Sequence, residues 1–291
     1  MKQKEIKVKN ISYFFEEIAR ERFSVLENVT TTFAYKKITA IIGASSSGKT
    51  VLLKHLNGLL IPTSGEVHID DYVIKANQKK IHNVNKIRKK IGFVFQFVQR
   101  QLFEETVEKD IIFGPLNFGF SKKNAKKNAK KYLKLLGLSE SFLKRSPFEL
   151  SGGQKSRVAI AGIFAYEPDF VIFDQLANGF DLSMKNNFLQ LLVNLRNEYN
   201  KTIIFTSNDN NDVLKIADGV IVLDQGKLIT KRPPMELFLD NVFCEKWKIK
   251  IPKTINFINL WKKYGFVADN LNFQDENKLI TSVVDYFKKK N

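Results

Sequence analysis

The chain has 291 residues, 44% of them hydrophobic and 26% charged, which is the composition of a globular protein with enough apolar residues for a packed core. No apolar run reaches the ~18 residues of a membrane-spanning helix. The N-terminus Met1-Lys-Gln-Lys-Glu lacks the apolar segment of a signal peptide. We therefore expect a cytoplasmic protein that reaches a membrane only through partners. The single cysteine, Cys244, excludes an internal disulfide and is expected in the core.

The formal net charge of +17 would suit a nucleic-acid partner or an anionic membrane surface. The lysines are spread along the whole chain without an aromatic and basic nucleic-acid signature, so we expect no nucleic-acid partner. The densest lysine cluster, 122–134, is predicted to be a helix. A solvated face is the favoured interpretation of its lysines, and attraction to lipid headgroups is the second. Its core side is expected to carry Tyr132, Leu133, Leu135 and Leu136.

The first third of the chain changes from strand to helix periodicity and back. Alternating residues over 6–33 predict two antiparallel strands around a charged interruption at 16–22. A strand at 37–42 is followed by a small-residue loop and a predicted helix over 49–60. Pro62 and Gly65 then turn the chain into a hairpin at 66–74.

Helical periods dominate from 96 to 164, which predicts a helical insertion in an α/β chain. Apolar runs then alternate with helical segments, as in a mainly parallel sheet, and lie at 170–173, 202–206 and 220–223. A break at Pro233-Pro234 precedes a tail of predicted short helices. We assign residues 1–232 to one domain, with 97–165 inserted as a helical subdomain, and 233–291 to a C-terminal helical extension.

A phosphate-binding loop lies between the predicted strand at 37–42 and the helix that follows. Its small residues let backbone N–H groups converge on phosphates at a helix N-terminus, where the dipole favours anions. Lys49 is predicted to reach the β- and γ-phosphates and Thr50 to bind Mg²⁺. A serine-rich connector is the alternative. The residues that fit the P-loop pattern are Gly43, Ala44, Ser45, Ser46, Ser47, Gly48, Lys49 and Thr50.

The second half of a P-loop site is an acid at the end of a buried strand. Asp174 follows the apolar run Phe170-Val171-Ile172-Phe173, at the carboxyl end where open α/β sheets place their ligands. Asp174 is therefore predicted to hold Mg²⁺ through water.

A third motif distinguishes among P-loop families. The run Leu150-Ser151-Gly152-Gly153-Gln154, followed by helical spacing to Phe164, resembles the signature of ABC-transporter ATPases. The resemblance implies that Ser151, Gly152, Gly153 and Gln154 contact the γ-phosphate bound by a second subunit in a head-to-tail dimer. A Ser-Gly-Gly helix start suits this role because it offers a hydroxyl, a helix dipole and unobstructed N–H groups. An N-cap by Ser151 is compatible with it.

The resemblance extends over 6–230 and implies an α/β P-loop NTPase core with an antiparallel N-terminal sheet. Gln96 matches the Q-loop glutamine, which senses Mg²⁺ and transmits to membrane subunits. The run Asn178-Gly179-Phe180-Asp181 matches the D-loop. One of Tyr13, Phe14 and Phe15 is expected to stack on adenine, with Phe15 preferred by position, and at least one of the three is expected to be a buried strand aromatic.

The run FQFVQRQLFEETVEKD at 95–110, with Phe113-Gly114-Pro115 and 117–119, resembles energy-coupling-factor (ECF) importers, in particular the second of their two paralogous ATPase subunits. Those ATPases typically carry Pro-Glu where Val98-Gln99 stands here. The resemblance implies a peripheral protein at the cytoplasmic face of the cell membrane that uses ATP to drive uptake of a vitamin or other micronutrient. Its partners would be a paralogous ATPase, a transmembrane coupling subunit and a substrate-capture membrane protein. The alternatives are an ATPase of another ABC transporter and a soluble ABC protein outside transport.

Two further departures from the pattern of the family bear on ATP hydrolysis. Gln175 stands where a Glu normally polarises the attacking water, and an uncharged amide is a poor general base. Asn208 replaces the switch histidine, and Leu176 replaces the usual Pro. We therefore expect this chain to bind ATP but to hydrolyse it poorly in its own site. Its intact signature would complete the partner's site.

Overall fold

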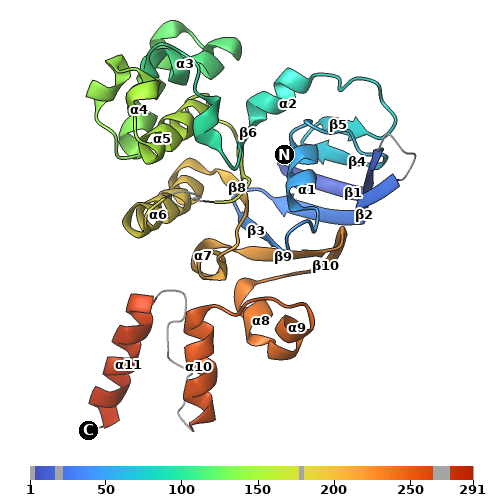
Figure 1. Cartoon of the computed structure of the whole chain (residues 1–291), viewed down its shortest axis with the longest axis vertical. Helices are drawn as coiled ribbons and strands as arrows, with labels where there is room; N and C mark the ends of the chain where they lie inside the picture. Colours follow the sequence, from blue (N-terminus) through green and yellow to red (C-terminus); the bar gives the residue numbers. More distant parts are fainter. Residues whose placement is uncertain (1–3, 17–21, 177–179, 265–275, 291) are drawn as a thin grey trace.

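The centre of the computed structural model is a mainly parallel sheet (Figure 1). The structure describes residues 4–16, 22–176, 180–264 and 276–290. The strands of this sheet are β3 (Ile38–Ile42), β6 (Ile91–Val94), β7 (Phe170–Phe173), β8 (Thr202–Thr206), β9 (Gly219–Asp224) and β10 (Lys227–Arg232). Their order is β10-β9-β3-β8-β7-β6, and β10 runs antiparallel to β9 while the other pairs are parallel. The predicted α/β class is confirmed.

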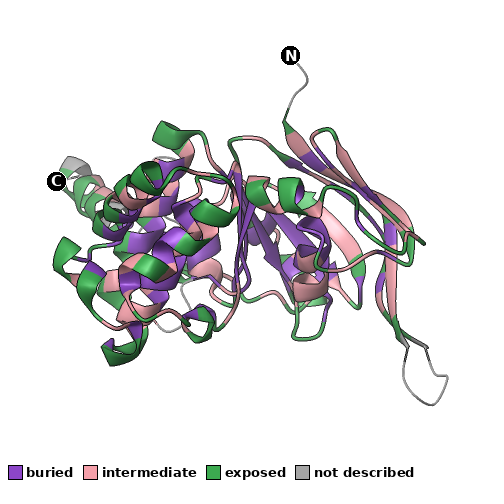
Figure 2. Cartoon of the chain, turned by 90° about the horizontal axis from the view of Figure 1, so that it is seen from above, coloured by how far each residue is buried: buried purple, intermediate pink, exposed green. Residues whose placement is uncertain are grey.

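Helices and a second sheet cover both faces of the central strands, which explains their continuous apolar runs. Every residue of β3, β6, β7 and β8 is buried, and Figure 2 shows the buried residues concentrated in this central layer and among the helices beside it. Because β3, β8 and β7 are parallel neighbours, their carboxyl ends meet at one edge. The segments after Ile42, Phe173 and Thr206 therefore lie close together.

The N-terminal strands form a separate antiparallel sheet, as predicted, with the order β2-β1-β4-β5. Its apolar face packs on α1 and on the central sheet through residues such as Ile11, Leu52 and Ile204. Of the predicted interruption at 16–22, residues 16 and 22 are the ends of the two strands, and 17–21 lie outside the described residues. The elements of this layer are β1 (Glu5–Glu16), β2 (Arg22–Ala34), β4 (Ser64–Ile69), β5 (Tyr72–Lys75) and α1 (Lys49–Leu56).

Helix α1 is shorter than the predicted helix over 49–60. It ends at Leu56, with Asn57 as its C-cap. Gly58 follows with a φ of 67°, a left-handed conformation that a helix cannot continue through. Leu59 therefore lies beyond the helix, and it is 37% exposed rather than packed in the core.

The helical insertion lies between β6 and β7, at the upper left of Figure 1. Its helices are α3 (Val107–Asn117), α4 (Lys122–Leu135) and α5 (Gly152–Phe164), with short 3₁₀ segments η1 (Val98–Gln101), η2 (Glu140–Lys144) and η3 (Pro147–Glu149). The remaining helices before the tail are α2 (Val84–Lys90), α6 (Leu182–Tyr199) and α7 (Asn210–Ile216).

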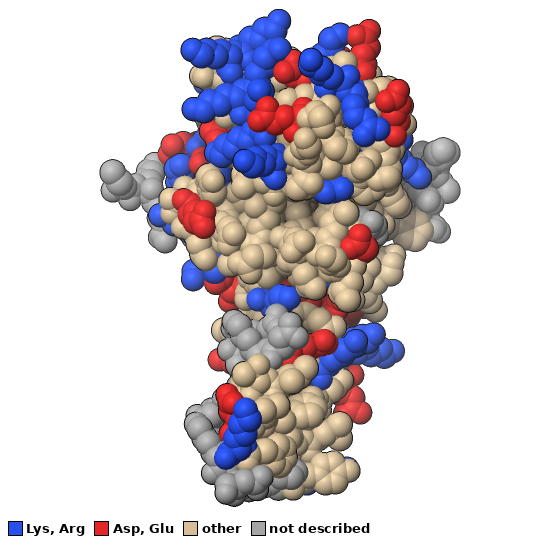
Figure 3. All heavy atoms as spheres, turned by 90° about the vertical axis from the view of Figure 1, so that its left-hand side faces the viewer, with Lys and Arg blue, Asp and Glu red and all other residues tan. Residues whose placement is uncertain are grey.

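Helix α4 buries a narrow stripe and presents its lysines outward. Ala125, Ala129, Tyr132 and Leu133 are buried, while Leu135 is 38% exposed, so its predicted core position is wrong. The reason is geometric. Residues i and i+2 of an α-helix point ~200° apart, so Leu135 cannot share the buried side of Leu133. Figure 3 views the molecule from the left-hand side of Figure 1 and shows Lys and Arg side chains gathered at the top, with acidic side chains among them. The α4 ion pairs join Lys126 to Glu108, Lys130 to Glu140 and Lys131 to Glu167.

The tail consists of helices that continue the core. Leu237, Cys244, Ile255 and Trp261 are buried in the same apolar cluster as α5 and α6, and Cys244 is in the core as expected. The domain boundary that we assign after residue 232 stays a prediction. Among the described residues, no helix combines the length and apolarity needed to cross a membrane. The tail helices are α8 (Pro234–Leu239), α9 (Asn241–Lys246), α10 (Lys253–Lys263) and α11 (Glu276–Lys290).

A buried histidine on α1 predicts a pH-dependent stability. Burial lowers the pKa of His55 from 6.5 to about 4, and its ring hydrogen-bonds to the Val51 carbonyl at 2.7 Å. The unfolded chain therefore takes up a proton below pH ~6.5 that the folded chain takes up only near its lower pKa. We expect the free energy of unfolding to fall by about 1.5 kcal/mol from pH 6.5 to 5 through this group.

Urea unfolding across this pH range should show a shallower slope in His55→Gln than in the parent chain. His82→Gln, at an exposed position, is the matched control and should keep the slope of the parent. Equal slopes in the parent and His55→Gln would contradict the assignment.

Candidate functional site

The loop between β3 and α1 has a backbone that requires glycine at two positions. Gly43 has a φ of 148°, and a Cβ there would lie 2.0 Å from the Leu223 carbonyl oxygen. Gly48 has a φ of 97°, and a Cβ there would lie 2.7 Å from the Val25 carbonyl oxygen. Both positions combine the left-handed region with close backbone approach, so neither tolerates a side chain. The loop is thereby held against β9 and β2 at the edge of the central sheet.

Lys49 begins α1 and places its ammonium group inside this loop. The Nζ atom donates to the carbonyl oxygens of Gly43 at 2.9 Å and Ala44 at 2.7 Å, and to Ser47 Oγ at 3.4 Å. Burial lowers the pKa of Lys49, and the negative charge of Asp174 opposes that shift. The loop thus holds a partly desolvated cation at the start of a helix, where anions are favoured.

Asp174 lies directly behind the loop, as the sequence predicted. Its carboxylate is 6% exposed and accepts from Thr50 Oγ1 at 2.9 Å on each oxygen. Thr206 Oγ1 donates to the same group at 3.3 Å. A carboxylate beside two hydroxyls is a set of hard oxygen donors, which fits Mg²⁺.

Gln175 and Gln96 meet at the far side of Asp174. Gln96 Nε2 donates to Gln175 Oε1 at 2.8 Å, which brings the Q-loop position onto the residue after the strand. Gln175 has a φ of 65°, and its backbone N–H donates to Thr206 Oγ1 at 2.7 Å. The turn after β7 is therefore fixed by β8, and the Gln175 amide faces the same space as the P-loop.

Lys49, Thr50, Asp174 and Gln175 line one cavity of about 410 Å³, and the predicted site residues Gly43, Ala44 and Gln96 are not among its lining residues. Phe15 is 47% exposed and borders the cavity, whereas Tyr13 packs edge-on against Phe15 and His55 with ring centroids 5.1 and 4.9 Å apart. Of the three candidate aromatics, Phe15 is the one that lines the cavity. The lining residues are Phe15, Val25, Ser45, Ser46, Ser47, Gly48, Lys49, Thr50, Val51, Asp174, Gln175, Thr206 and Asn208.

Sequence reasoning missed Val25, Val51 and Thr206. Thr206 bonds both Asp174 and the Gln175 backbone, so it joins two predicted residues. A signal existed, because Thr206 is the last residue of β8 and directly precedes the segment that contains Asn208. Its partners lie about 30 residues away in the chain, so their pairing required the sheet order.

The signature residues lie outside this cavity, at the exposed N-terminus of α5. Ser151 caps the helix by accepting from the Gln154 N–H at 3.3 Å, and Gln154 Oε1 accepts from the Ser151 N–H at 3.0 Å. Ser151 and Gly152 are exposed. A Cβ on Gly152 would meet nothing within 4 Å, so no described contact of this chain requires glycine there.

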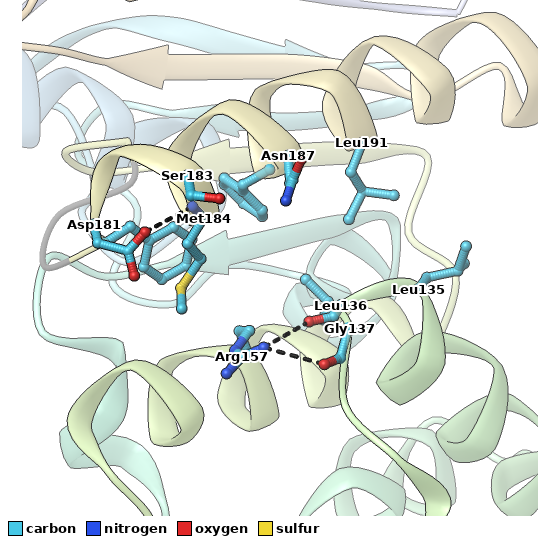
Figure 4. A pocket seen from close by; sticks show the side chains of 11 residues that line it. Leu135, Leu136, Gly137, Arg157, Asp181, Ser183, Met184, Asn187 and Leu191 are labelled. Carbon is cyan, nitrogen blue, oxygen red and sulfur yellow. Dashed lines mark hydrogen bonds between the residues drawn. The ribbon is translucent and has the colours of Figure 1, made fainter.

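Asp181 begins α6 beside a second cavity of about 380 Å³ between α6 and the helical insertion (Figure 4). Its Oδ1 accepts from the Met184 N–H at 2.8 Å. On the opposite wall, Arg157 Nη1 donates to the carbonyl oxygens of Leu136 at 3.4 Å and Gly137 at 3.2 Å (Figure 4). The D-loop positions Asn178 and Gly179 lie outside the described residues. Asp181 thus lies away from the P-loop cavity, like the signature.

The sequence of this chain is similar to those of known proteins. The ABC transporter family model matches residues 26–178. A relative from Spiroplasma kunkelii, named energy-coupling factor transporter ATP-binding protein EcfA2, is 42% identical over 281 residues, which are 97% of this chain and 92% of that protein. The chain belongs to the ATP-binding subunits of energy-coupling factor transporters. An EcfA2 protein of Ligilactobacillus salivarius is 44% identical over 272 residues, which are 93% of this chain and 94% of that protein.

Solved structures agree with the fold of this ECF subunit. CbiO1 from Clostridium perfringens, part of the ABC transporter complex cbiONQ, has a TM-score of 0.72 at 29% identity and covers 89% of this chain and 100% of its own. The ATP-binding cassette MJ0796, solved as a dimer with ADP and Pi, has a TM-score of 0.71 at 31% identity and covers 79% of this chain and 98% of its own. The predicted ABC and ECF resemblance is confirmed.

Removing the Lys49 ammonium tests the cavity. Because Lys49 carries the cation inside the P-loop, Lys49→Ala should weaken ATP binding by about 10- to 100-fold, the range of a charge-assisted hydrogen bond. Calorimetry with MgATP measures the affinity of each variant. Lys54→Ala, on the same helix but outside the cavity lining, is the control and should bind like the parent. Equal affinities for Lys49→Ala and the parent would contradict this site.

Proposed function

We propose that this ECF subunit binds MgATP in its P-loop cavity and pairs head to tail with a paralogous ATPase, so that ATP energises uptake of a vitamin or other micronutrient. One observation carries the proposal. A single cavity brings together an exposed aromatic ring, the P-loop cation and an oxygen-donor pair beside Gln175 and Asn208. An aromatic platform, a phosphate cradle and a cation site are the three parts that a nucleoside triphosphate requires.

Each part has a stated role. Phe15 would stack on adenine, the P-loop N–H groups and Lys49 would hold the phosphates, and Asn208 would donate a hydrogen bond to the γ-phosphate. Thr50 and Asp174, with Gln96 beside them, would hold Mg²⁺. When bound, the ion neutralises charge on the β- and γ-phosphate oxygens.

A second ATPase subunit is proposed because no phosphate-binding group among the described residues of this chain faces the signature. Ser151 and Gly152 are exposed at a helix N-terminus, away from the P-loop cavity. Asp181 lines the cavity between α6 and the helical insertion, and the next residue, Leu182, is 75% exposed. A facing P-loop from a paralogue would give these residues a phosphate ligand, and head-to-tail pairing would do so at both sites.

A transmembrane coupling subunit is proposed to dock beside Gln96. The segment that follows Gln96 exposes Phe97 by 45% and Phe103 by 57%, and Phe103 packs edge-on against the 44% exposed Phe113 with ring centroids 4.9 Å apart. Exposed aromatic groups of this kind fit the apolar anchors of a docking helix. The subunit would then work peripherally at the cytoplasmic face of the membrane, while a separate membrane protein captures the micronutrient.

Hydrolysis in the pair is proposed to be asymmetric. The Gln175 amide can orient water but cannot take its proton, and Asn208 lacks a titratable imidazole. This chain's site would therefore retain ATP, whereas the partner's site, completed by Ser151 and Gly152, would turn over.

Restoring the two family residues tests the asymmetry. In heterodimers whose partner lacks its P-loop lysine, Gln175→Glu with Asn208→His should raise phosphate release by about 10²- to 10⁴-fold, the usual effect of a general base. Glu at 175 can still accept the hydrogen bond from Gln96. Substantial release by the unrestored chain in the same heterodimer would show that the amides support hydrolysis.

The partner site is tested from the opposite side. Gly152→Ala adds a methyl group with space around it in this chain, so folding and the chain's own MgATP affinity should not change. In the heterodimer, Gly152→Ala and Ser151→Ala should both reduce turnover at the partner's P-loop, and Gly219→Ala, also in open space, is the control. Sedimentation of this chain together with the paralogous ATPase should show the heterodimer when ATP is present. Full turnover in Gly152→Ala, or only monomers with ATP, would contradict the head-to-tail model.

A further inference from the structure

One half-buried ammonium group outside the nucleotide cavity joins two elements that the proposed function assigns to different sites. Lys185 Nζ lies 2.7 Å from Asp209 Oδ2 and 2.8 Å from Asp212 Oδ1. Its side chain is only 21% exposed, and that of Asp212 is 7% exposed. Burial disfavours the charge, but the hydrogen bonds to both carboxylates outweigh it and raise the pKa of Lys185. The Asp212 side of this two-partner contact is shielded from solvent, whereas the Asp209 side chain is 43% exposed.

Asp209 follows Asn208 directly, and its contacts fix the segment that carries Asn208. The Asp209 N–H donates to Ser207 Oγ at 3.0 Å, and Ser207 Oγ donates back to the Asp209 carbonyl at 3.1 Å. Asp209 Oδ1 accepts from the Asn211 N–H at 3.0 Å and so caps α7, while Oδ2 is committed to Lys185. The two oxygens of one carboxylate therefore hold the Asn208 segment to α7 and to α6.

The other end of this contact lies in the first turn of α6. The Lys185 backbone N–H donates to the Asp181 carbonyl at 2.8 Å, so the ammonium group and the D-loop aspartate belong to one helical turn. In the proposed dimer, Asp181 faces the partner while Asn208 faces this chain's own nucleotide. Lys185 is the bridge between them.

We infer that Lys185 is a positioning residue that holds Asn208 in place for its contact with the γ-phosphate. The inference rests on the proposed function, because it needs ATP in the P-loop cavity. Without the ammonium group, Asp209 and Asp212 would face each other as partly buried like charges and push the Asn208 segment away from α6. Helix α7 would remain, because acidic groups at a helix N-terminus are favourable.

The contact predicts an effect on ATP that ADP does not share, since ADP has no γ-phosphate. The experiment is calorimetry of MgATP and MgADP binding to the full chain. Lys185→Ala should reduce the ATP-to-ADP affinity ratio by about 10-fold, the value of one hydrogen bond to a charged group, and leave MgADP affinity unchanged. Lys185→Arg keeps the charge and should retain most of the ratio.

Two comparisons separate positioning from general loss of structure. Lys215 also bridges α7 and α6, donating to Asn186 Oδ1 at 3.1 Å, so Lys215→Ala is the matched control and should keep the parental ratio. Asn208→Ala should lower the ratio, and the double variant Lys185→Ala/Asn208→Ala should lower it no further, because both changes act on the same contact.

Several results would overturn the inference. They are an unchanged ratio in Lys185→Ala, equal losses of ATP and ADP affinity, or additive effects in the double variant. A parent chain that binds neither nucleotide would overturn the proposed function as well, which distinguishes the two failures.

Discussion

The contact between Thr50 and Asp174 is the one on which the rest of the site depends. It joins the helix after the P-loop to the end of β7, two segments separated by 124 residues, through hydrogen bonds of 2.9 Å to both carboxylate oxygens. The contact exists because β3, β8 and β7 are parallel neighbours whose carboxyl ends meet at one edge. Thr206, at the end of the middle strand, bonds the same carboxylate and completes the arrangement.

The chain divides its functional residues between two surfaces. The P-loop, Asp174 and Asn208 line one cavity, while Ser151 and Asp181 lie on the side of α5 and α6. A nucleotide site built from both surfaces needs two subunits. This division makes it physically reasonable for one subunit to keep a complete signature while its own cavity carries Gln175 and Asn208.

The substituted residues are part of an ordered structure. Gln175 accepts a hydrogen bond from Gln96, its backbone is held by Thr206, and the Asn208 segment is tied to α6 through Asp209 and Lys185. The geometry around these positions is therefore maintained although the usual carboxylate and imidazole are replaced by amides. Such an arrangement suits a site that holds nucleotide, because binding depends on position and hydrolysis depends on a group that can take a proton.

The sequence by itself determined the features that short-range patterns encode. The P-loop, Asp174, the signature and the strands at 170–173 and 202–206 follow from spacing and apolar runs, and the structure confirms both strands. It favoured Phe15 for the cavity by position, but it did not determine that Thr206 bonds Asp174 or that Lys185 contacts Asp209 and Asp212. Those depend on contacts between segments distant in the chain, which only the order of the strands and the packing of α6 against α7 bring together.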